Sequence, residues 1–328
     1  MKIKLVKRII VMAMIVVVLV GCGKSNAKTA STNLNQAKSI RIGDQGTYFT
    51  AKVAYVKGFF KEEFGEDFEI TISTFANGPA STEALTANGI DFAFFGDVPA
   101  VVGNANNNDI KVISSFWNAE EGYYLIARKD SGINTLADIK GKRIAFGAGT
   151  NSHKLILKFL KAVNLTESDV QMINLASNTN AALVKGDVDL ITGSQPTLDT
   201  VLGQVNGKVV ATSKGYDSCI VVALGKSEFM EANPDITARY LKVLDKTNKW
   251  MAENVDEASQ IVATFTNTEK ADARKYYDTR TWEIGFSDDL KAILADTLDF
   301  SYKQGVVTNN DVKILYDDSY IKAAGLQK

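Results

Sequence analysis

From residue 39 onward, short runs rich in β-branched and aromatic residues alternate with segments whose apolar residues recur every three or four positions. The strand pattern covers residues 39–43, 68–75, 90–95 and 111–116, and the helical pattern covers residues 50–64, 80–88 and 99–106. Strands that alternate with helices predict βαβ units, which build a mostly parallel sheet with helices on both faces. The alternation therefore predicts an α/β fold.

A similar order of elements returns later in the sequence. The predicted strand 142–146 is followed by a glycine-containing loop and a helix through residue 163, as strand 39–43 is followed by a loop and a helix. Val188-Asp189-Leu190-Ile191 also matches Ile90-Asp91-Phe92-Ala93 in its pattern. Two similar halves in one chain predict two lobes that face each other.

The last third of the chain differs from both halves. After residue 222 the sequence predicts mainly helices, over residues 235–253, 256–265, 268–277 and 288–304. We infer that the third quarter of the chain forms one lobe, while the start and the helical end form the other.

The first 38 residues have the composition of a targeting segment. Basic residues at positions 2, 4, 7 and 8 precede an apolar run over residues 9–20, which is too short to span a bilayer comfortably. The run ends in Gly21-Cys22, which resembles a bacterial lipobox, whose cysteine is diacylated and becomes the new N-terminus. Residues 1–21 are therefore predicted to be a lipoprotein signal peptide, Cys22 the lipidated residue that anchors the chain to the membrane, and residues 22–38 a flexible tether.

The overall composition excludes several classes of function. The 328 residues include 37 basic and 38 acidic ones, so no basic surplus indicates a nucleic-acid partner. Removal of residues 1–21 takes away four positive charges and lowers the formal charge from −1 to −5. One histidine and two cysteines cannot supply a multi-histidine metal site or a four-cysteine zinc site. We therefore expect no metal, no cofactor and no catalytic residues.

Short motifs in both halves resemble one known family. They are Asn77-Gly78-Pro79, Gly89-Ile90-Asp91, Gly96-Asp97-Val98-Pro99, residues 138–145, Gly149-Thr150-Asn151-Ser152-His153, Asn233-Pro234 and Tyr302-Lys303-Gln304-Gly305. In order and spacing, over nearly all of residues 39–326, the chain resembles the type II periplasmic solute-binding proteins of ABC importers. The branch in question takes up aliphatic sulfonates, taurine and nitrate.

The resemblance implies an α/β fold of the type II periplasmic binding protein class. Two doubly wound α/β lobes would be joined by two crossover strands, over residues 123–128 and 218–224, and would carry a helical C-terminal extension. Lobe 1 would comprise residues 39–120 and 220–328, and lobe 2 residues 121–219.

The resemblance also implies a function. The protein would be a monomer, lipid-anchored at the extracytoplasmic face of the cell membrane, in the periplasm if the source is Gram-negative. It would bind a small anionic or zwitterionic solute, such as a sulfonate or taurine, in the interlobe cleft. It would then deliver the solute to an ABC permease dimer with a cytoplasmic ATPase.

Loops between strand ends and helix starts supply the candidate ligand-binding residues, because ligands bind beyond the carboxyl ends of the strands in open α/β sheets. Helix N-termini there offer unpaired N–H groups to an anion, hydroxyl and amide side chains add donors, and glycines allow close backbone approach. The candidates are Gln45, Gly46, Thr47, Tyr48, Asn77, Gly78, Gly96, Asp97, Trp117, Glu121, Thr150, Asn151, Ser152, Ser194 and Gln195. Helix capping is the alternative role for each threonine, serine and asparagine.

Acidic residues near the predicted cleft bear on the nature of the ligand. Asp44, Asp97 and Glu120 or Glu121 would repel a plain divalent anion. They would suit the ammonium of a zwitterion such as taurine, or an amino-substituted ring stacked on Trp117 or Tyr48. The alternative is a solvated hinge loop with ordinary surface carboxylates.

Other functions on the same fold remain open, since a fold alone does not determine function. They are a binding protein of the same family for a thiamine-precursor-like pyrimidine, an enzyme, and a sensory receptor. His153 beside Ser152 makes a poor nucleophile–base pair, because neighbouring residues on a helix point to different faces. The predicted lipoprotein signal also argues against an enzyme. For a binding protein, the predicted mechanism is closure of the cleft around the ligand.

Overall fold

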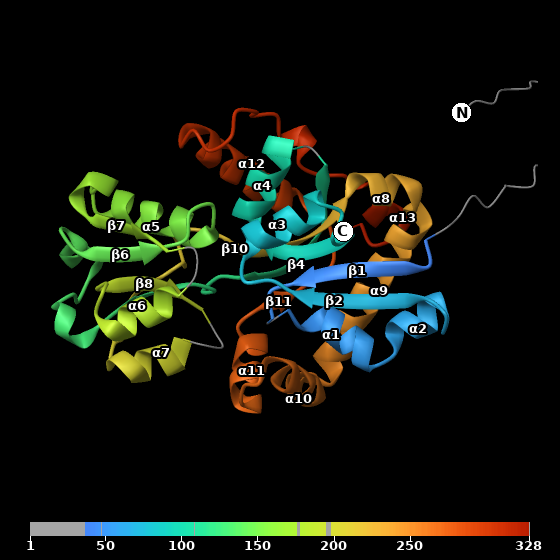
Figure 1. Cartoon of the computed structure of the whole chain (residues 1–328), viewed down its shortest axis with the longest axis horizontal. Helices are drawn as coiled ribbons and strands as arrows, with labels where there is room; N and C mark the ends of the chain where they lie inside the picture. Colours follow the sequence, from blue (N-terminus) through green and yellow to red (C-terminus); the bar gives the residue numbers. More distant parts are fainter. Residues whose placement is uncertain (1–36, 47, 108, 176–177, 195–197, 328) are drawn as a thin grey trace, which may run out of the picture. The chain divides into compact units, whose positions relative to one another are not determined.

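The computed structural model describes residues 37–46, 48–107, 109–175, 178–194 and 198–327 (Figure 1). The predicted signal peptide, the lipidated Cys22 and nearly all of the tether lie outside these residues, as do the candidates Thr47 and Gln195. Within the described part, no helix is both long enough and apolar enough to cross a membrane.

Six strands form the first sheet, in the order β11-β4-β10-β3-β1-β2. They are β1 Ser39–Asp44, β2 Glu69–Thr74, β3 Phe92–Gly96, β4 Ile110–Ala119, β10 Cys219–Lys226 and β11 Thr281–Trp282. β1 pairs in parallel with β2 and β3, whereas β10 runs antiparallel to both β3 and β4. We call this sheet and the helices packed on it the six-stranded lobe.

Ten α-helices belong to the six-stranded lobe as described. They are α1 Phe49–Val56, α2 Phe59–Phe64, α3 Gly78–Thr86, α4 Asp97–Asn107, α8 Ser227–Ala232, α9 Pro234–Glu253, α10 Val255–Thr266, α11 Lys270–Asp278, α12 Asp288–Lys303 and α13 Ser319–Ala323. Helices α3 and α4 lie on one face of the sheet and α1 and α9 on the other (Figure 1).

Five strands form the second sheet, in the order β7-β6-β8-β5-β9. They are β5 Tyr124–Ala127, β6 Arg143–Phe146, β7 Gln171–Asn174, β8 Leu190–Gly193 and β9 Lys208–Thr212, and their helices are α5 Asn151–Ala162, α6 Thr179–Lys185 and α7 Leu198–Val205. Short 3-10 helices are η1 Lys129–Ser131, η2 Leu136–Ile139 and η3 Glu167–Asp169 here, and η4 Val312–Ile314 near the C-terminus. Helix α5 covers one face and α6 and α7 the other, and we call this the five-stranded lobe (Figure 1).

Two connections join the sheets, through residues 120–123 between β4 and β5 and through residues 213–218 between β9 and β10. The hydroxyl of Ser213 accepts the N–H of Gly122 at 3.2 Å and donates to the carbonyl of Glu120 at 3.2 Å. The N–H of Ser213 donates to the carbonyl of Tyr123 at 2.9 Å, so this residue ties the two connections together. The predicted fold class, two doubly wound lobes joined by two crossover strands with a helical C-terminal extension, is confirmed.

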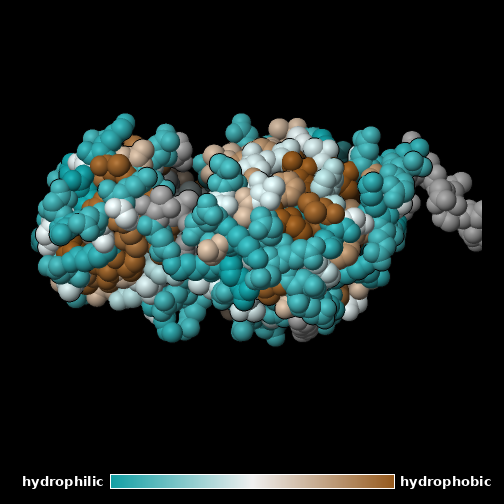
Figure 2. Space-filling view, turned by 90° about the horizontal axis from the view of Figure 1, so that it is seen from below, coloured by the Kyte–Doolittle hydropathy of each residue, from teal (hydrophilic) through white to brown (hydrophobic). Residues whose placement is uncertain are grey.

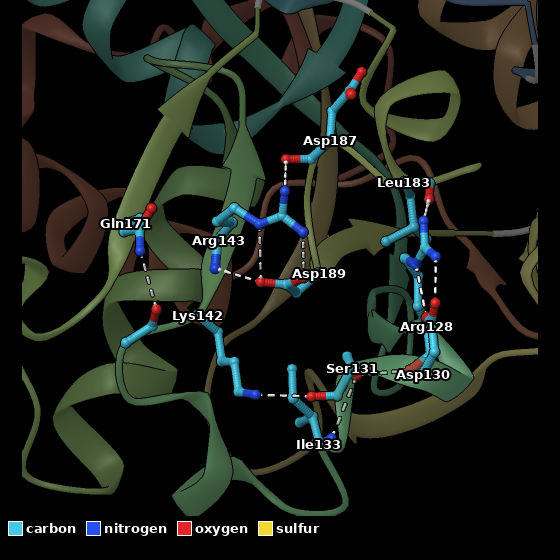
Figure 3. Close-up of polar contacts among 11 residues, drawn as sticks. Arg128, Asp130, Ser131, Ile133, Lys142, Arg143, Gln171, Leu183, Asp187 and Asp189 are labelled. Carbon is cyan, nitrogen blue, oxygen red and sulfur yellow. Dashed lines mark hydrogen bonds and ion pairs between the residues drawn. The ribbon is translucent and has the colours of Figure 1, made fainter. Parts of the chain in front are cut away.

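An identical arginine–aspartate contact occurs in both lobes. In β1, Arg41 donates from Nε to Asp91 Oδ2 at 3.1 Å and from Nη2 to Oδ1 at 2.5 Å, and its backbone N–H donates to Oδ2 at 2.8 Å. In β6, Arg143 makes the same three bonds to Asp189, at 3.2, 2.6 and 2.9 Å (Figure 3). Each aspartate immediately precedes a central strand, β3 or β8. The shared contact supports the internal repeat that the sequence predicts.

Each lobe has its own hydrophobic core. β3 is buried along its whole length, as expected for a strand in a sheet that is covered on both faces, and its Phe92 stacks on Tyr240 with ring centroids 4.2 Å apart. In the five-stranded lobe, Leu155 and Phe159 of α5 pack with Ile144 of β6. The face in Figure 2 is largely hydrophilic, with scattered hydrophobic patches of the kind that most folded proteins expose.

Two local predictions are wrong. The single helix predicted over residues 50–64 is two helices, because Gly58 between α1 and α2 has a φ of +75° that ends the first helix. The short edge strand β11 was not predicted, since its two residues give no periodic signal and depend on pairing with Trp117 and Asn118 of β4.

Candidate functional site

A buried ion pair between Asp44 and Lys52 holds the loop from β1 to α1 in place. Asp44 and Lys52 are 0% and 3% exposed, and the Lys52 ammonium contacts Asp44 Oδ2 and donates to the carbonyl of Gly46 at 2.9 Å. Asp44 Oδ1 accepts the N–H of Gly46 at 2.7 Å. Gly46 has a φ of +87°, a conformation that favours glycine, so its role is to shape this turn. Lys52 already compensates the charge of Asp44, so the structure gives no support to a ligand ammonium here, and that contact stays a prediction.

Gln45 and Tyr48 lie on this fixed loop and bond to each other. The Tyr48 hydroxyl donates to Gln45 Oε1 at 3.2 Å, which orients the amide. The amide nitrogen Nε2 of Gln45 is buried and has no hydrogen-bond partner among the described residues. The Tyr48 ring meets the Trp117 ring edge-on, with centroids 6.4 Å apart. The structure thus brings the candidates Gln45, Tyr48 and Trp117 together.

Arg280 lies on the other side of Trp117 and was not predicted from the sequence. Its guanidinium carbon is 3.4 Å from the ring centroid of Tyr276 and 4.7 Å from that of Trp117, distances at which a cation is attracted to an aromatic face. Arg280 is only 9% exposed. Its Nη1 donates to the carbonyl of Tyr276 at 2.8 Å and to the hydroxyl of Thr279 at 2.7 Å.

Unpaired hydrogen-bond donors gather around this cation. In the part of the chain that is described, no carboxylate pairs with Arg280, and its Nε, like Nε1 of Trp117, is buried without a hydrogen-bond acceptor. Gln45 Nε2 is the third such donor. Buried polar groups are normally satisfied, so an acceptor supplied from outside the protein would suit these three N–H groups.

The charge of Arg280 reaches the connections between the lobes. Burial raises the pKa of Tyr123 well above its usual value, and Arg280 opposes that rise. The same holds for Tyr124 and for the thiol of Cys219, the first residue of β10. Arg280 therefore lies near enough to residues 123–124 and to the start of β10 for its positive charge to act on them.

A second group of candidates meets on the α4–α5 side. Asp97, at the start of α4, is fully buried and accepts a hydrogen bond from Asn151 Nδ2 of α5. Its Oδ2 pairs with the Lys154 ammonium at 3.3 Å and accepts from the Thr297 hydroxyl of α12. A Cβ atom on Gly96 would collide with Asn151, so this glycine allows close approach of the two lobes, and a ligand contact by it stays a prediction. Asp97 is compensated by protein groups, and an ammonium partner for it is not needed.

Two of the remaining candidates, Thr150 and Ser152, flank Asn151 of the second group in the chain. Thr150 donates from its hydroxyl to the carbonyl of Gly147 at 2.7 Å, and Ser152 bonds to the hydroxyl of Thr192. Ser194 is partly buried just after β8, and its carbonyl accepts the N–H of Leu198 at 3.1 Å. Glu121 is exposed in the connection from β4 to β5.

Asn77 and Gly78 have structural roles at the start of α3. Asn77 caps the helix, since its side-chain oxygen accepts the N–H of Ala80 at 3.0 Å. A Cβ atom on Gly78 would collide with Pro99, so the absence of a side chain lets α3 and α4 pack closely. A ligand contact by either residue stays a prediction.

His153 packs inside the five-stranded lobe. Its ring centroid lies 4.5 Å from that of Phe146, and its Nε2 has no partner among described residues. Burial lowers the pKa of His153. The described residues also contain no group of three or more histidine, cysteine, aspartate or glutamate side chains placed to hold a metal ion.

In comparisons with known proteins, this chain is similar to several proteins that are named as sulfonate-binding proteins. The chain is 29% identical over 323 residues to a putative aliphatic sulfonates-binding protein of Bacillus subtilis (strain 168), covering 97% of this chain and 96% of the relative. Its fold matches the alkanesulfonate-binding protein SsuA from Xanthomonas axonopodis pv. citri, solved bound to MOPS, with a TM-score of 0.78 and 21% identity over 86% of this chain and 99% of that one. It also matches the periplasmic aliphatic sulphonate binding protein SsuA from Escherichia coli, with a TM-score of 0.75 and 22% identity over 86% and 92%.

These relatives are binding proteins, and their fold is that of periplasmic binding proteins. A family model described as NMT1/THI5 like matches residues 47–258, well over half of the sequence. The chain therefore belongs to the NMT1/THI5-like family.

Proposed function

We propose that this protein is the extracytoplasmic solute-binding component of an ABC importer and that its cleft holds a small organic anion with a sulfonate-like head. The observation that carries the proposal is the cation Arg280, buried without a carboxylate partner among the described residues, beside unpaired donors of Gln45 and Trp117. A sulfonate supplies three acceptor oxygens and one negative charge, which match this set of donors.

The arrangement favours an anion over a zwitterion. The faces of Trp117 and Tyr276 that would attract an ammonium are already occupied by the Arg280 guanidinium, which would repel a second cation. Asp44 and Asp97 are compensated by Lys52 and Lys154. Glu121 is the candidate carboxylate left to receive an ammonium, and it is exposed to solvent, where a single ion pair contributes little. An alkanesulfonate is therefore preferred to taurine.

Binding rather than catalysis is proposed. The thiol of Cys219 is buried, and burial raises its pKa well above the usual range, which makes it a poor nucleophile. The ring of His153 packs on Phe146, and its Nε2 makes no hydrogen bond to a nucleophile among the described residues. A pyrimidine-binding protein or an enzyme on the same fold would need polar groups that contact a ring edge, and the described donors suit an anion better.

The sequence supplies the rest of the proposal. Residues 1–21 would direct export, Cys22 would carry the lipid anchor, and residues 22–38 would tether the folded part to the membrane. Lobe 1 would comprise residues 39–120 and 220–328 and lobe 2 residues 121–219. The monomer would deliver its ligand to a permease dimer. The name of the Bacillus relative, an aliphatic sulfonates-binding protein, supports the binding of a sulfonate.

Titration calorimetry tests the proposal with four ligands, namely pentane-1-sulfonate, taurine, nitrate and an aminopyrimidine. We expect pentane-1-sulfonate to bind most tightly. Binding of the aminopyrimidine alone would overturn the sulfonate assignment in favour of a thiamine-precursor role. No heat with any of the four would overturn the proposed ligand class.

A further inference from the structure

Lys154 is a fully buried cation that connects the two lobes. It lies in the second turn of α5, in the five-stranded lobe, and its side chain is 0% exposed. Its ammonium pairs with Asp97 of α4 at 3.3 Å and donates to the Thr297 hydroxyl of α12 at 2.8 Å, both in the six-stranded lobe. It also pairs with Asp217, in the connection between β9 and β10, at 3.1 Å. One side chain of α5 thus binds three other segments of the chain.

The charges around Lys154 hold it in place. Burial lowers the pKa of Lys154, but the surrounding charges of Asp97, Asp217 and Asp296 outweigh burial and raise the pKa above its usual value. Lys158, one turn further along α5, shares Asp217 at 2.7 Å and Asp296 at 3.1 Å. Loss of one partner from such a buried network would leave charges without compensation, which is strongly destabilising.

Close packing adds to this ionic contact. Asn151, one turn before Lys154, donates to Asp97 and fills the space above Gly96. The segment that carries Asp217 also carries Ser213, which bonds to the other connection. The α4–α5 contact is therefore next to the two connections, where a rotation of one lobe against the other moves atoms least.

The ion pair between α7 and α11 is exposed to solvent, in contrast to the buried ion pairs of Lys154. Lys275 of α11 pairs with Asp199 of α7, and these side chains are 52% and 45% exposed. Exposed ion pairs contribute little and are screened by salt, so this ion pair can break and form at small cost. Arg280 follows α11 closely in the chain, which places the proposed anion site toward this side.

We propose that Lys154 is a positioning residue that keeps the start of α5 against α4 in both the ligand-free and the ligand-bound protein, so that the cleft opens and closes on the α7–α11 side. The proposal rests on the proposed function only in that a ligand closes the cleft. Lys154 touches no ligand in this account. It fixes the position of Thr150, Asn151 and Ser152 at the cleft.

Distance measurements between spin labels test which side moves. One label pair, at Asn106 of α4 and Lys161 of α5, reports on the Lys154 side, and another, at Gln204 of α7 and Ala271 of α11, reports on the opposite side; all four positions are exposed. Labels on a ketone-bearing unnatural side chain leave Cys22 and Cys219 unmodified. On addition of pentane-1-sulfonate we expect the α7–α11 distance to shorten and the α4–α5 distance to stay the same. An α4–α5 distance that changes as much as the other would overturn the proposal.

Charge-balanced variants separate positioning from stability. Lys154→Met together with Asp97→Asn removes one charge of each sign and leaves Asp217 paired with Lys158, so we expect it to fold. We expect a broadened α4–α5 distance distribution without ligand and a Kd for pentane-1-sulfonate raised about tenfold, because binding must then order the two lobes. The matched control, Lys158→Met with Asp296→Asn, also removes one charge of each sign, from α5 and α12, and should keep the wild-type distances and Kd.

The two proposals fail in different ways. If pentane-1-sulfonate gives no heat and moves neither label pair, the proposed ligand is wrong, while the ligand-free distributions still decide the role of Lys154. If the Lys154→Met/Asp97→Asn variant keeps a narrow α4–α5 distribution without ligand, Lys154 is not the positioning residue, whatever the ligand is.

Discussion

The guanidinium of Arg280 lies over the ring of Tyr276, with its carbon 3.4 Å from the ring centroid. Its second aromatic neighbour, Trp117, comes from strand β4 and offers an unpaired N–H. A buried cation that is held by aromatic faces rather than by a carboxylate keeps its charge available for an anion. If this charge is used for binding, its removal should weaken the affinity for an anionic ligand.

Replacement of Arg280 removes the proposed counter-charge. We expect Arg280→Met to raise the Kd for pentane-1-sulfonate by about 30-fold or more, since loss of one partner of a buried charge pair costs about 2 kcal/mol or more. Arg274→Met is the matched control, because Arg274 lies on α11, is exposed and pairs with Asp256 and Asp278. Calorimetry in which the two variants bind equally well would refute the role of Arg280.

Removal of the indole N–H of Trp117 tests whether this donor binds the ligand. Trp117→Phe keeps an aromatic ring but removes the donor, and we expect the Kd to rise by about tenfold, the value of a hydrogen bond to a charged acceptor. Trp282→Phe is the comparison, since Trp282 Nε1 already donates to the carbonyl of Tyr277 at 3.1 Å. That variant should lose stability and keep its affinity, and the reverse pattern would contradict the assignment.

The Asp44–Lys52 pair gives a prediction about stability. Lys52→Met leaves Asp44 buried and uncompensated, so urea unfolding should show a loss of about 3–5 kcal/mol. The double variant Asp44→Asn/Lys52→Met should recover most of that loss, because no buried charge remains. Failure of the second substitution to restore stability would show that the pair is not the cause.

His153 predicts a dependence of stability on pH. Burial lowers its pKa below the usual value of 6.5, so below that pH the unfolded chain binds a proton that the folded protein does not. The free energy of unfolding should therefore fall as the pH drops below about 6.5 and be fully retained above it. Urea unfolding of the wild type and His153→Gln measures this, and equal slopes in the two proteins would contradict it.

Local pattern predicts much of the fold. The alternation of strands and helices, the repeat and the long C-terminal helices follow from periodicity, and Asp91 and Asp189 occupy equivalent positions in the two lobes. Gln45, Tyr48 and Trp117 were predicted as candidates because they flank strand ends. Those features are encoded within short stretches of sequence.

Contacts between distant segments could not be predicted in this way. Arg280 reaches the site because β11 pairs with β4, bringing residues more than 160 positions apart into contact, and a two-residue strand gives no local signal. Lys154 and Lys52 occupy helical positions at which lysine is usually exposed, and only the tertiary structure pairs them with Asp97 and Asp44. The same pairs give both aspartates a compensating cation inside the protein, and ligand contacts by them stay predictions.

The central claim is that the anionic head of the ligand binds at Arg280. A crystal structure with 2-bromoethanesulfonate, whose bromine gives an anomalous signal, tests it most directly. We predict sulfonate oxygens within hydrogen-bond distance of Arg280, Trp117 Nε1 and Gln45 Nε2. A sulfonate bound instead at the start of α4 or α5, with Arg280 left without an acceptor, would contradict the account.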